Sequence, residues 1–230
     1  MKEPINKALI FDLDGTLVLT EQYHSSAFES ALAPYSISYS YKEHIENYSG
    51  RGTPEIIEIK LKEAGQPLSL LPKLAKTKKV AYQMLIDRLG APVVNGVKAF
   101  IRKAYSAKII LAVATSNTRE GANRIVRAIG CANYFKTIAT RDDVKRAKPY
   151  PDIFLAAARE IGIKPDEAVV FEDSPRGIEA ASRGGFATVG LTTSATKTAL
   201  LAKGADLIIK DYTALSLSEV LHLSNRNKQL

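Results

Sequence analysis

Two aspartates separated by one residue stand at the end of the first apolar run of the sequence. They belong to the string Phe11-Asp12-Leu13-Asp14-Gly15-Thr16-Leu17. Two carboxylates so close repel each other unless a proton or a cation lies between them, and Mg²⁺ prefers oxygen ligands of this kind. One carboxylate can also act as a nucleophile toward phosphate, with the other as general acid and base. The string therefore predicts metal-dependent phosphate chemistry at Asp12 and Asp14, with two solvated aspartates in a polar turn as the plainer alternative.

A second polar cluster, Thr115-Ser116-Asn117, directly follows the apolar run 108–114. A hydroxyl and backbone N–H groups at a turn from strand to helix form a natural cradle for phosphate. Ser116, Asn117 and Thr118 are all competent residues for a simple helix N-cap. Taken alone, this cluster favours the helix N-cap.

A lysine and a second acidic pair complete the set. Lys148 is followed by Pro-Tyr-Pro, and these prolines would fix the start of a helix and direct the lysine inward, where it would offset negative charge on a phosphoryl group. Glu172-Asp173-Ser174 follows a further apolar run. Asp12, Asp173 and the backbone carbonyl of Asp14 would make a suitable Mg²⁺ site, with Glu172 beside them. A surface lysine and an N-cap at Ser174 or Asp173 are the alternatives.

The elements that must position these residues follow a regular pattern, in which β-branched apolar runs alternate with amphipathic stretches. This is typical of an α/β fold with a parallel sheet flanked by helices, and the continuous hydrophobicity suits strands buried on both faces. We expect strands at 7–11, 108–114, 137–140, 168–171, 187–189 and 207–209, and helices at 97–105, 120–129, 152–161, 176–183 and 196–203. Because parallel sheets bind ligands at the carboxyl ends of their strands, the clusters that follow three of these strands should meet at one edge.

Residues 19–92 separate the first expected strand from the second by far more than a crossover needs. The span has helical patterns of its own at 23–33, 54–64 and 70–89. It predicts a small helical cap domain inserted after the first strand, whose two crossings are potential hinges. Residues 1–18 and 93–230 would then form a Rossmann-like core, and residues 19–92 the cap.

The composition is that of an ordinary globular protein, with 46% hydrophobic and 24% charged residues. The longest apolar runs are too short to cross a bilayer, and residues 1–7 hold no apolar segment of signal-peptide length. Cys131 is the only cysteine, which excludes an intramolecular disulfide and a cysteine-based zinc site. We expect a cytoplasmic protein that binds no membrane.

The formal charge of +8 would also suit a nucleic-acid binder, whose affinity would fall with salt and would not depend on Asp12. The one dense basic run, Lys73, Lys76, Lys78 and Lys79, lies among helix-forming residues. A solvated helix face and the attraction of a small anionic substrate both explain such a run. The motifs favour the substrate, so we expect a small phosphorylated metabolite as partner, no nucleic acid, and a monomer or weak dimer.

With the four clusters in this order, the sequence resembles the haloacid dehalogenase superfamily of phosphotransferases, in the subgroup whose helical cap follows the first strand. The resemblance covers the chain from Phe11 to about Ile209. It implies a nucleophile at Asp12 and a general acid and base at Asp14. It also implies that Thr115, Ser116 and Asn117 hold the phosphoryl group, that Lys148 neutralises its charge, and that Asp173 with Glu172 completes the Mg²⁺ site.

Within this resemblance, Asp14 restricts the types of reaction that the chain can be expected to catalyse. Members that cleave carbon–halogen bonds lack an acidic residue at this position, because a departing halide needs no proton. Phosphonate-cleaving relatives lack it as well. The presence of Asp14 therefore implies an alkoxide leaving group and a phosphate ester as substrate.

The chain is similar to β-phosphoglucomutases and to the sugar-phosphate and phosphoglycolate phosphatases that share their cap. His24, the loop containing Arg51, and Lys78 resemble mutase residues that assist the acid/base aspartate or contact the substrate, although a half-exposed helix histidine and a plain surface loop would look the same. Thr16 stands where mutases carry an aliphatic residue. We expect hydrolysis of a sugar or sugar-alcohol phosphate, with a hexose-phosphate mutase, in which a sugar hydroxyl takes the phosphoryl group from Asp12, as the alternative.

Overall fold

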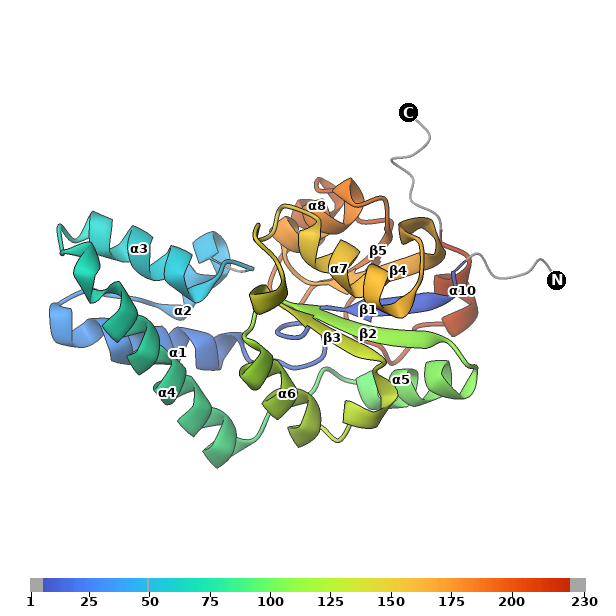
Figure 1. The fold of residues 1–230 in the computed structure, drawn as a ribbon, viewed down its shortest axis with the longest axis horizontal. Helices are drawn as coiled ribbons and strands as arrows, with labels where there is room; N and C mark the ends of the chain where they lie inside the picture. Colours follow the sequence, from blue (N-terminus) through green and yellow to red (C-terminus); the bar gives the residue numbers. More distant parts are fainter. Residues whose placement is uncertain (1–5, 49, 224–230) are drawn as a thin grey trace.

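Six short strands form one parallel sheet in the computed structural model, which describes residues 6–48 and 50–223 (Figure 1). The order across the sheet is β3-β2-β1-β4-β5-β6. The strands are β1 (Ala8–Phe11), β2 (Ile110–Thr115), β3 (Thr137–Thr140), β4 (Ala168–Glu172), β5 (Ala187–Leu191) and β6 (Leu207–Ile209). They confirm the expected strands, with ends that shift by one or two residues.

Alternate residues of the central strands enter two separate hydrophobic layers, because successive side chains of a strand point to opposite faces. Leu9 and Phe11 pack on one face with α5 (Val97–Ser106), α6 (Arg119–Ala128) and α10 (Leu217–Leu221). Ala8 and Ile10 pack on the other face with α7 (Asp152–Ile161) and α8 (Pro175–Arg183). The helices that cover the sheet in this way explain the continuous apolar runs. A further helix, α9 (Lys197–Leu201), belongs to a separate small cluster in which its Leu200 packs with Ile178 of α8.

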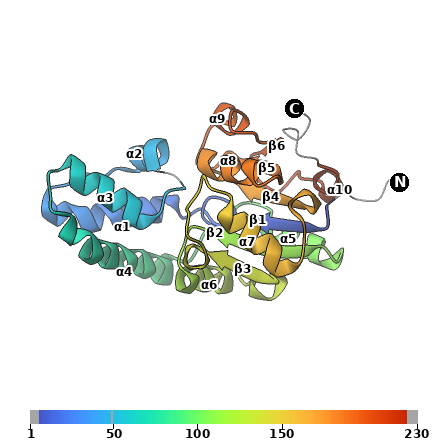
Figure 2. The ribbon, with the colours of Figure 1, turned by 45° about the horizontal axis from the view of Figure 1, so that its top comes forward.

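A helical cap lies beside the sheet and is inserted between β1 and β2 (Figures 1 and 2). Its helices are α1 (Glu21–Leu32), α2 (Tyr41–Glu43), α3 (Thr53–Glu63) and α4 (Leu71–Leu89). They bury a hydrophobic cluster of their own, which includes Phe28, Leu32, Ile57 and Leu61. A cap after the first strand was therefore expected correctly, while its boundaries at 19 and 92 stay a prediction.

Several short helical turns were not expected, because a segment of three to five residues is too short to show a period. They are the 3₁₀ turns Ala33–Tyr35, Leu68–Leu70, Ala132–Tyr134, Arg141–Asp143 and Pro165–Glu167, and a π-helical turn at His44–Tyr48 that continues α2. Within residues 6–48 and 50–223, no helix has both the length and the apolar character that a membrane span requires.

The sheet order explains how residues far apart in sequence reach one place. β1 lies between β2 and β4, with Phe11 beside both Val113 and Phe171. Since all three strands are parallel, their carboxyl ends meet at one edge of the sheet. Asp12, Thr115 and Glu172 stand at these ends, and the backbone N–H of Asp12 donates to the carbonyl of Phe171 at 2.9 Å.

Candidate active site

A buried lysine joins the first acidic motif to the last one. The Nζ atom of Lys148 donates to Oδ1 of Asp12 and to Oε1 of Glu172, each at 2.6 Å. Burial opposes the charged form of Lys148, but the negative charges of Asp12 and Glu172 raise the pKa of this lysine above its ordinary value. Lys148 is therefore an inward-pointing cation and not a surface residue.

Glu172 uses its other oxygen to hold the turn that follows β4. Its Oε2 accepts from the backbone N–H groups of Asp173 and Ser174, at 2.8 and 2.7 Å, and from the Ser174 hydroxyl at 2.9 Å. The Ser174 hydroxyl in turn accepts from the N–H of Gly177 at 3.1 Å and caps α8. The expected alternative of an N-cap thus applies to Ser174, while Glu172 orients both this cap and Lys148.

Three buried carboxylates form a group that could hold a metal ion. Asp12, Glu172 and Asp173 each offer one oxygen, and these oxygens lie within 4.8 Å of one another. Gly15 makes the close approach possible, because a Cβ atom there would lie 1.9 Å from Oδ2 of Asp173, and its φ of +76° suits glycine. The Ser194 hydroxyl donates to the same oxygen of Asp173.

The negative charges of Asp12, Glu172 and Asp173 favour the binding of a further cation. Burial, opposed by Lys148 but reinforced by Glu172, raises the pKa of Asp12 to about 8. Burial and the charges of Glu172, Glu21 and Asp12 raise the pKa of Asp173 well above its ordinary value. A donor set made only of oxygen, with an excess of negative charge, is what Mg²⁺ takes in proteins, so these residues fit that ion.

Asp14 lies opposite this group and is surrounded by hydrogen-bond donors. Its Oδ1 accepts from the hydroxyls of Thr20 and Tyr82, the latter at 3.2 Å, and lies 3.2 Å from Nε2 of His24. Its Oδ2 accepts from Nδ2 of Asn117 at 3.4 Å. Burial raises the pKa of Asp14, but His24 and the Thr20 hydroxyl lower it by more. The net shift is downward, so the carboxyl is ionised in this state.

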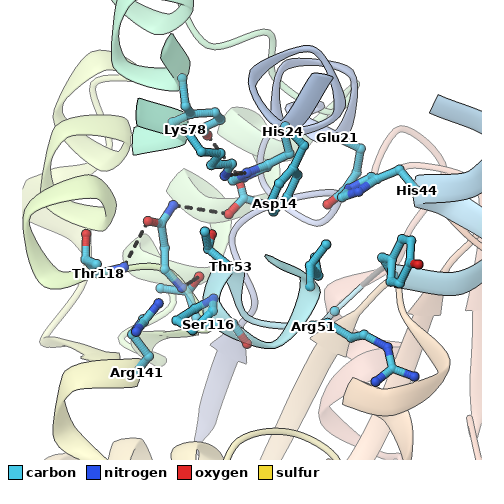
Figure 3. A pocket seen from close by; sticks show the side chains of 18 of the residues that line it. Asp14, Glu21, His24, His44, Arg51, Thr53, Lys78, Ser116, Thr118 and Arg141 are labelled. Atoms are coloured by element: carbon cyan, nitrogen blue, oxygen red, sulfur yellow. Dashed lines mark hydrogen bonds and ion pairs between the residues drawn. The ribbon is translucent and has the colours of Figure 1, made fainter. Parts of the chain in front are cut away.

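Two cap residues, His24 and Lys78, lie beside Asp14 (Figure 3). The Nζ of Lys78 lies 2.6 Å from Nδ1 of His24, whose ring stacks on Tyr82 with 4.2 Å between centroids. An ammonium can only donate, so Nδ1 accepts and the ring proton is on Nε2, facing Asp14. Burial and the charge of Lys78 lower the pKa of His24, and burial lowers that of Lys78 to about 8. His24 is thus a neutral donor within a chain of hydrogen bonds.

The cluster after β2 lines the same cavity as Asp12 and Asp14. Thr118, and not Ser116 or Asn117, caps α6, because its hydroxyl accepts from the N–H of Gly121 at 3.3 Å. The side-chain carbonyl of Asn117 accepts from the N–H of Thr118 at 2.9 Å, and its backbone N–H donates to Oγ1 of Thr115 at 3.1 Å. The turn is therefore held in shape by its own side chains.

Arg51 lines the cavity, but its guanidinium is already committed. It pairs with Glu55 through Nη1 and donates from Nε to the carbonyl of Asn47 at 3.0 Å. In Figure 3 its guanidinium points away from Asp14. Contact of Arg51 with a substrate remains a prediction.

The cavity between cap and core has a volume of about 350 Å³, which suits a small metabolite. Ion pairs join the two parts on both sides of it. On one side, Lys79 and Asp87 of α4 pair with Glu120 and Arg124 of α6 at 2.7 and 2.8 Å. On the other side, Oε2 of Glu55 lies 3.5 Å from Nη2 of Arg176, a residue of α8 that also donates to the Lys148 carbonyl. These pairs hold the cap against the core.

Several residues of the cavity wall were not found from the sequence. Tyr82 contacts Asp14, and Glu21 pairs with His44 at 2.6 Å. Helical spacing could have indicated Tyr82, four residues after Lys78, and Glu21, three residues before His24, because such neighbours share a helix face. Arg141 also lines the cavity, but it follows β3 in a short turn whose sequence carries no recognisable signal.

Comparisons with known proteins agree with this geometry. The family model described as haloacid dehalogenase-like hydrolase matches residues 9–191. The validoxylamine A 7'-phosphate phosphatase of Streptomyces hygroscopicus subsp. limoneus is 32% identical over 90% of this chain and 94% of that protein. The fructose-1-phosphate phosphatase of Escherichia coli is 33% identical over 79% of this chain and 94% of that protein. Matches also include β-phosphoglucomutases.

A solved structure is similar to this chain over nearly its whole length. CbbY from Rhodobacter sphaeroides, crystallised in complex with xylulose-(1,5)bisphosphate, superposes with a TM-score of 0.83 at 29% identity. The match covers 94% of this chain and 99% of that one. The similarity therefore extends over the cap as well as the core.

Proposed function

The chain belongs to the haloacid dehalogenase-like hydrolase family, and from this premise we propose that it is a Mg²⁺-dependent phosphatase that hydrolyses a small sugar phosphate through a phospho-aspartate on Asp12. The observation that carries the proposal is that buried Asp12 is paired with Lys148 and lines the cavity together with Asp14. Two relatives are named for phosphatase activity on phosphorylated small molecules.

In the first step, a carboxylate oxygen of Asp12 attacks phosphorus and the bond between phosphorus and the ester oxygen breaks. Lys148 offsets the charge of the nucleophile and of the phosphoryl oxygens. The hydroxyl of Thr115 and the N–H groups of the turn at Ser116 and Asn117 receive those oxygens. Each of these groups lines the cavity.

Asp14 gives its proton to the departing alkoxide and later takes one from the attacking water. Its present partners favour the ionised form, but a phosphate dianion beside it favours protonation, since like charges disfavour a second negative group. Water then displaces the phosphoryl group from Asp12 and leaves inorganic phosphate and a free carboxylate. His24 holds Asp14 in place through Nε2 in both steps.

Asp12, Asp173 and the backbone carbonyl of Asp14 would hold Mg²⁺, which when bound supplies positive charge at the phosphoryl oxygens. Glu172 belongs to the same acidic group, yet both its oxygens accept hydrogen bonds. We assign to Glu172 the positioning of Lys148 and of the turn at Asp173. The role of the ion pairs between cap and core is to exclude bulk water during the first step.

A hexose-phosphate mutase is the second candidate, because the cap brings His24 to Asp14 and Lys78 to His24, and both cap residues resemble mutase positions. A panel of sugar monophosphates with Mg²⁺ separates the two functions. It should include β-glucose 1-phosphate with a trace of the bisphosphate. Release of inorganic phosphate supports the phosphatase, and glucose 6-phosphate without such release refutes it in favour of the mutase. Asp12→Asn should abolish turnover in either case.

A further inference from the structure

Arg141 is a cation of the cavity wall that the proposed reaction does not use. It begins the turn Arg141–Asp143, directly after β3. β3 pairs with β2, so this turn lies next to the one that would hold the phosphoryl group. The backbone N–H of Arg141 donates to the carbonyl of Asn117 at 3.2 Å, and in Figure 3 its side chain stands beside Ser116.

The guanidinium of Arg141 has little to bind in the protein itself. Among the described residues, its ion pair is with the adjacent Asp142 at 3.9 Å, and Oδ2 of Asp142 already accepts from the N–H of Arg119 at 2.9 Å. The other arginine of the cavity, Arg51, has a close carboxylate partner in Glu55. The guanidinium of Arg141 is thus half-buried and faces the cavity, and its several N–H donors have no matching acceptor among the described residues.

The charges around Arg141 indicate which ligand would fill this place. Lys78 faces the same cavity, and, after burial, the positive charge of Arg141 is a cause that lowers the pKa of Lys78. Lys76 also lines the cavity and lies on the exposed face of α4. Cations that face one another across a cavity repel, and an anion between them removes the repulsion.

We propose that Arg141 binds a second anionic group of the substrate, a phosphate or a carboxylate, while the first phosphate is attacked at Asp12. The planar guanidinium fork matches either group with two parallel hydrogen bonds. Arg141 is then a specificity-determining residue, and the preferred substrates are phosphate esters with two anionic groups. This inference rests on the proposed function, whose substrate class it narrows.

Kinetics with matched substrates test the inference. Glycerol 3-phosphate and 3-phosphoglycerate differ by a carboxylate, and fructose 1-phosphate and fructose 1,6-bisphosphate by a phosphate. The wild type should prefer the doubly anionic member of at least one pair by about tenfold or more in kcat/KM, the factor that one charge-assisted hydrogen bond provides. Arg141→Met should bring this ratio close to one and leave kcat/KM for the singly anionic member within about twofold. The pair that responds identifies the group.

Two results would overturn the inference. One is an unchanged ratio in Arg141→Met. The other is an equal loss on both members of each pair, which would mean that Arg141 contacts the transferred phosphoryl group. Arg102→Met, on the exposed face of α5 and outside the cavity wall, is the control, and its ratio should stay that of the wild type.

Binding to Asp12→Asn separates this inference from the proposed function. Calorimetry should show tighter binding of the doubly anionic ligand to Asp12→Asn, and loss of that preference in Asp12→Asn combined with Arg141→Met. If the wild type turns over no phosphate ester but this preference is present, the proposed function fails and the Arg141 site stands. If the double variant binds both ligands as Asp12→Asn does, the Arg141 site fails whatever the turnover.

Discussion

The buried acidic group should make the metal-free protein less stable as pH rises from about 4 to about 8. Burial raises the pKa of Asp12 from 3.8 to about 8, so the folded protein keeps a proton that the unfolded chain releases. A pKa raised by folding contributes stability that is fully present below the unfolded value and is lost as pH rises through the folded value. The window for Asp12 therefore runs from about 4 to about 8.

The magnitude follows from the same two values. They differ by about 4, and each pKa unit corresponds to about 1.4 kcal/mol, so Asp12 alone costs on the order of 5 kcal/mol of unfolding free energy at pH 8. This is comparable with the total stability of a small domain. A bound divalent cation favours the carboxylate and should cancel much of the loss.

Denaturant unfolding of chelator-treated protein, at about pH 5 and about pH 8 and with or without Mg²⁺, measures this effect. The wild type should lose several kcal/mol between the two pH values without the metal, and much less with it. Asp12→Asn is the matched variant, because it keeps the shape and an acceptor for Lys148 but carries no charge. Its loss should be smaller, though not zero, since the pKa of Asp173 is also raised. Parallel pH profiles for the wild type and Asp12→Asn would refute the reasoning.

Three further predictions concern the acid/base residue and the cap. Asp14→Asn should lower kcat on an alkyl phosphate by about 10²- to 10⁴-fold but affect an aryl phosphate far less, because a phenolate leaves without a proton; an equal loss on both would contradict the assignment. Lys78→Met should raise the pKa of His24, since it removes a positive charge that lowers it, and an unchanged NMR titration of this ring would refute the contact. Arg176→Lys should raise KM several-fold, while the free energy of unfolding changes by about 1 kcal/mol or less. Glu55→Gln is the control for the cap contact. A KM equal to that of the wild type would show that the pair does not hold the cap.

Much of the core could be predicted from short stretches of sequence. The strands that end before Asp12, Thr115 and Glu172 lie within one or two residues of their expected positions, because a strand buried on both faces is a continuous apolar run. The meeting of these residues at one edge followed from the parallel order of strands. The family resemblance was confirmed by the match over residues 9–191.

The structural roles of individual polar residues were harder to predict. Ser174 and Thr118 are the residues that cap α8 and α6, and Glu172 is held by backbone donors of the turn that follows it. Several side chains in each motif can cap a helix or bind an anion, and the choice depends on the turn geometry. That geometry depends on packing against the neighbouring strand and on charges elsewhere, such as Lys148.

The sequence by itself determined the fold class and the inserted cap, and it predicted the chemistry at Asp12 and Asp14, since these depend on residue types and periods along a local stretch of chain. Only the tertiary structure decided which side chains of the cap reach that chemistry. It brought Lys78 to His24, 54 residues away, and turned Arg51 toward Glu55. It also left Arg141 facing the cavity with a distant partner in Asp142. The physical reason is that contacts between cap and core arise from packing of segments far apart in sequence, which no local period encodes.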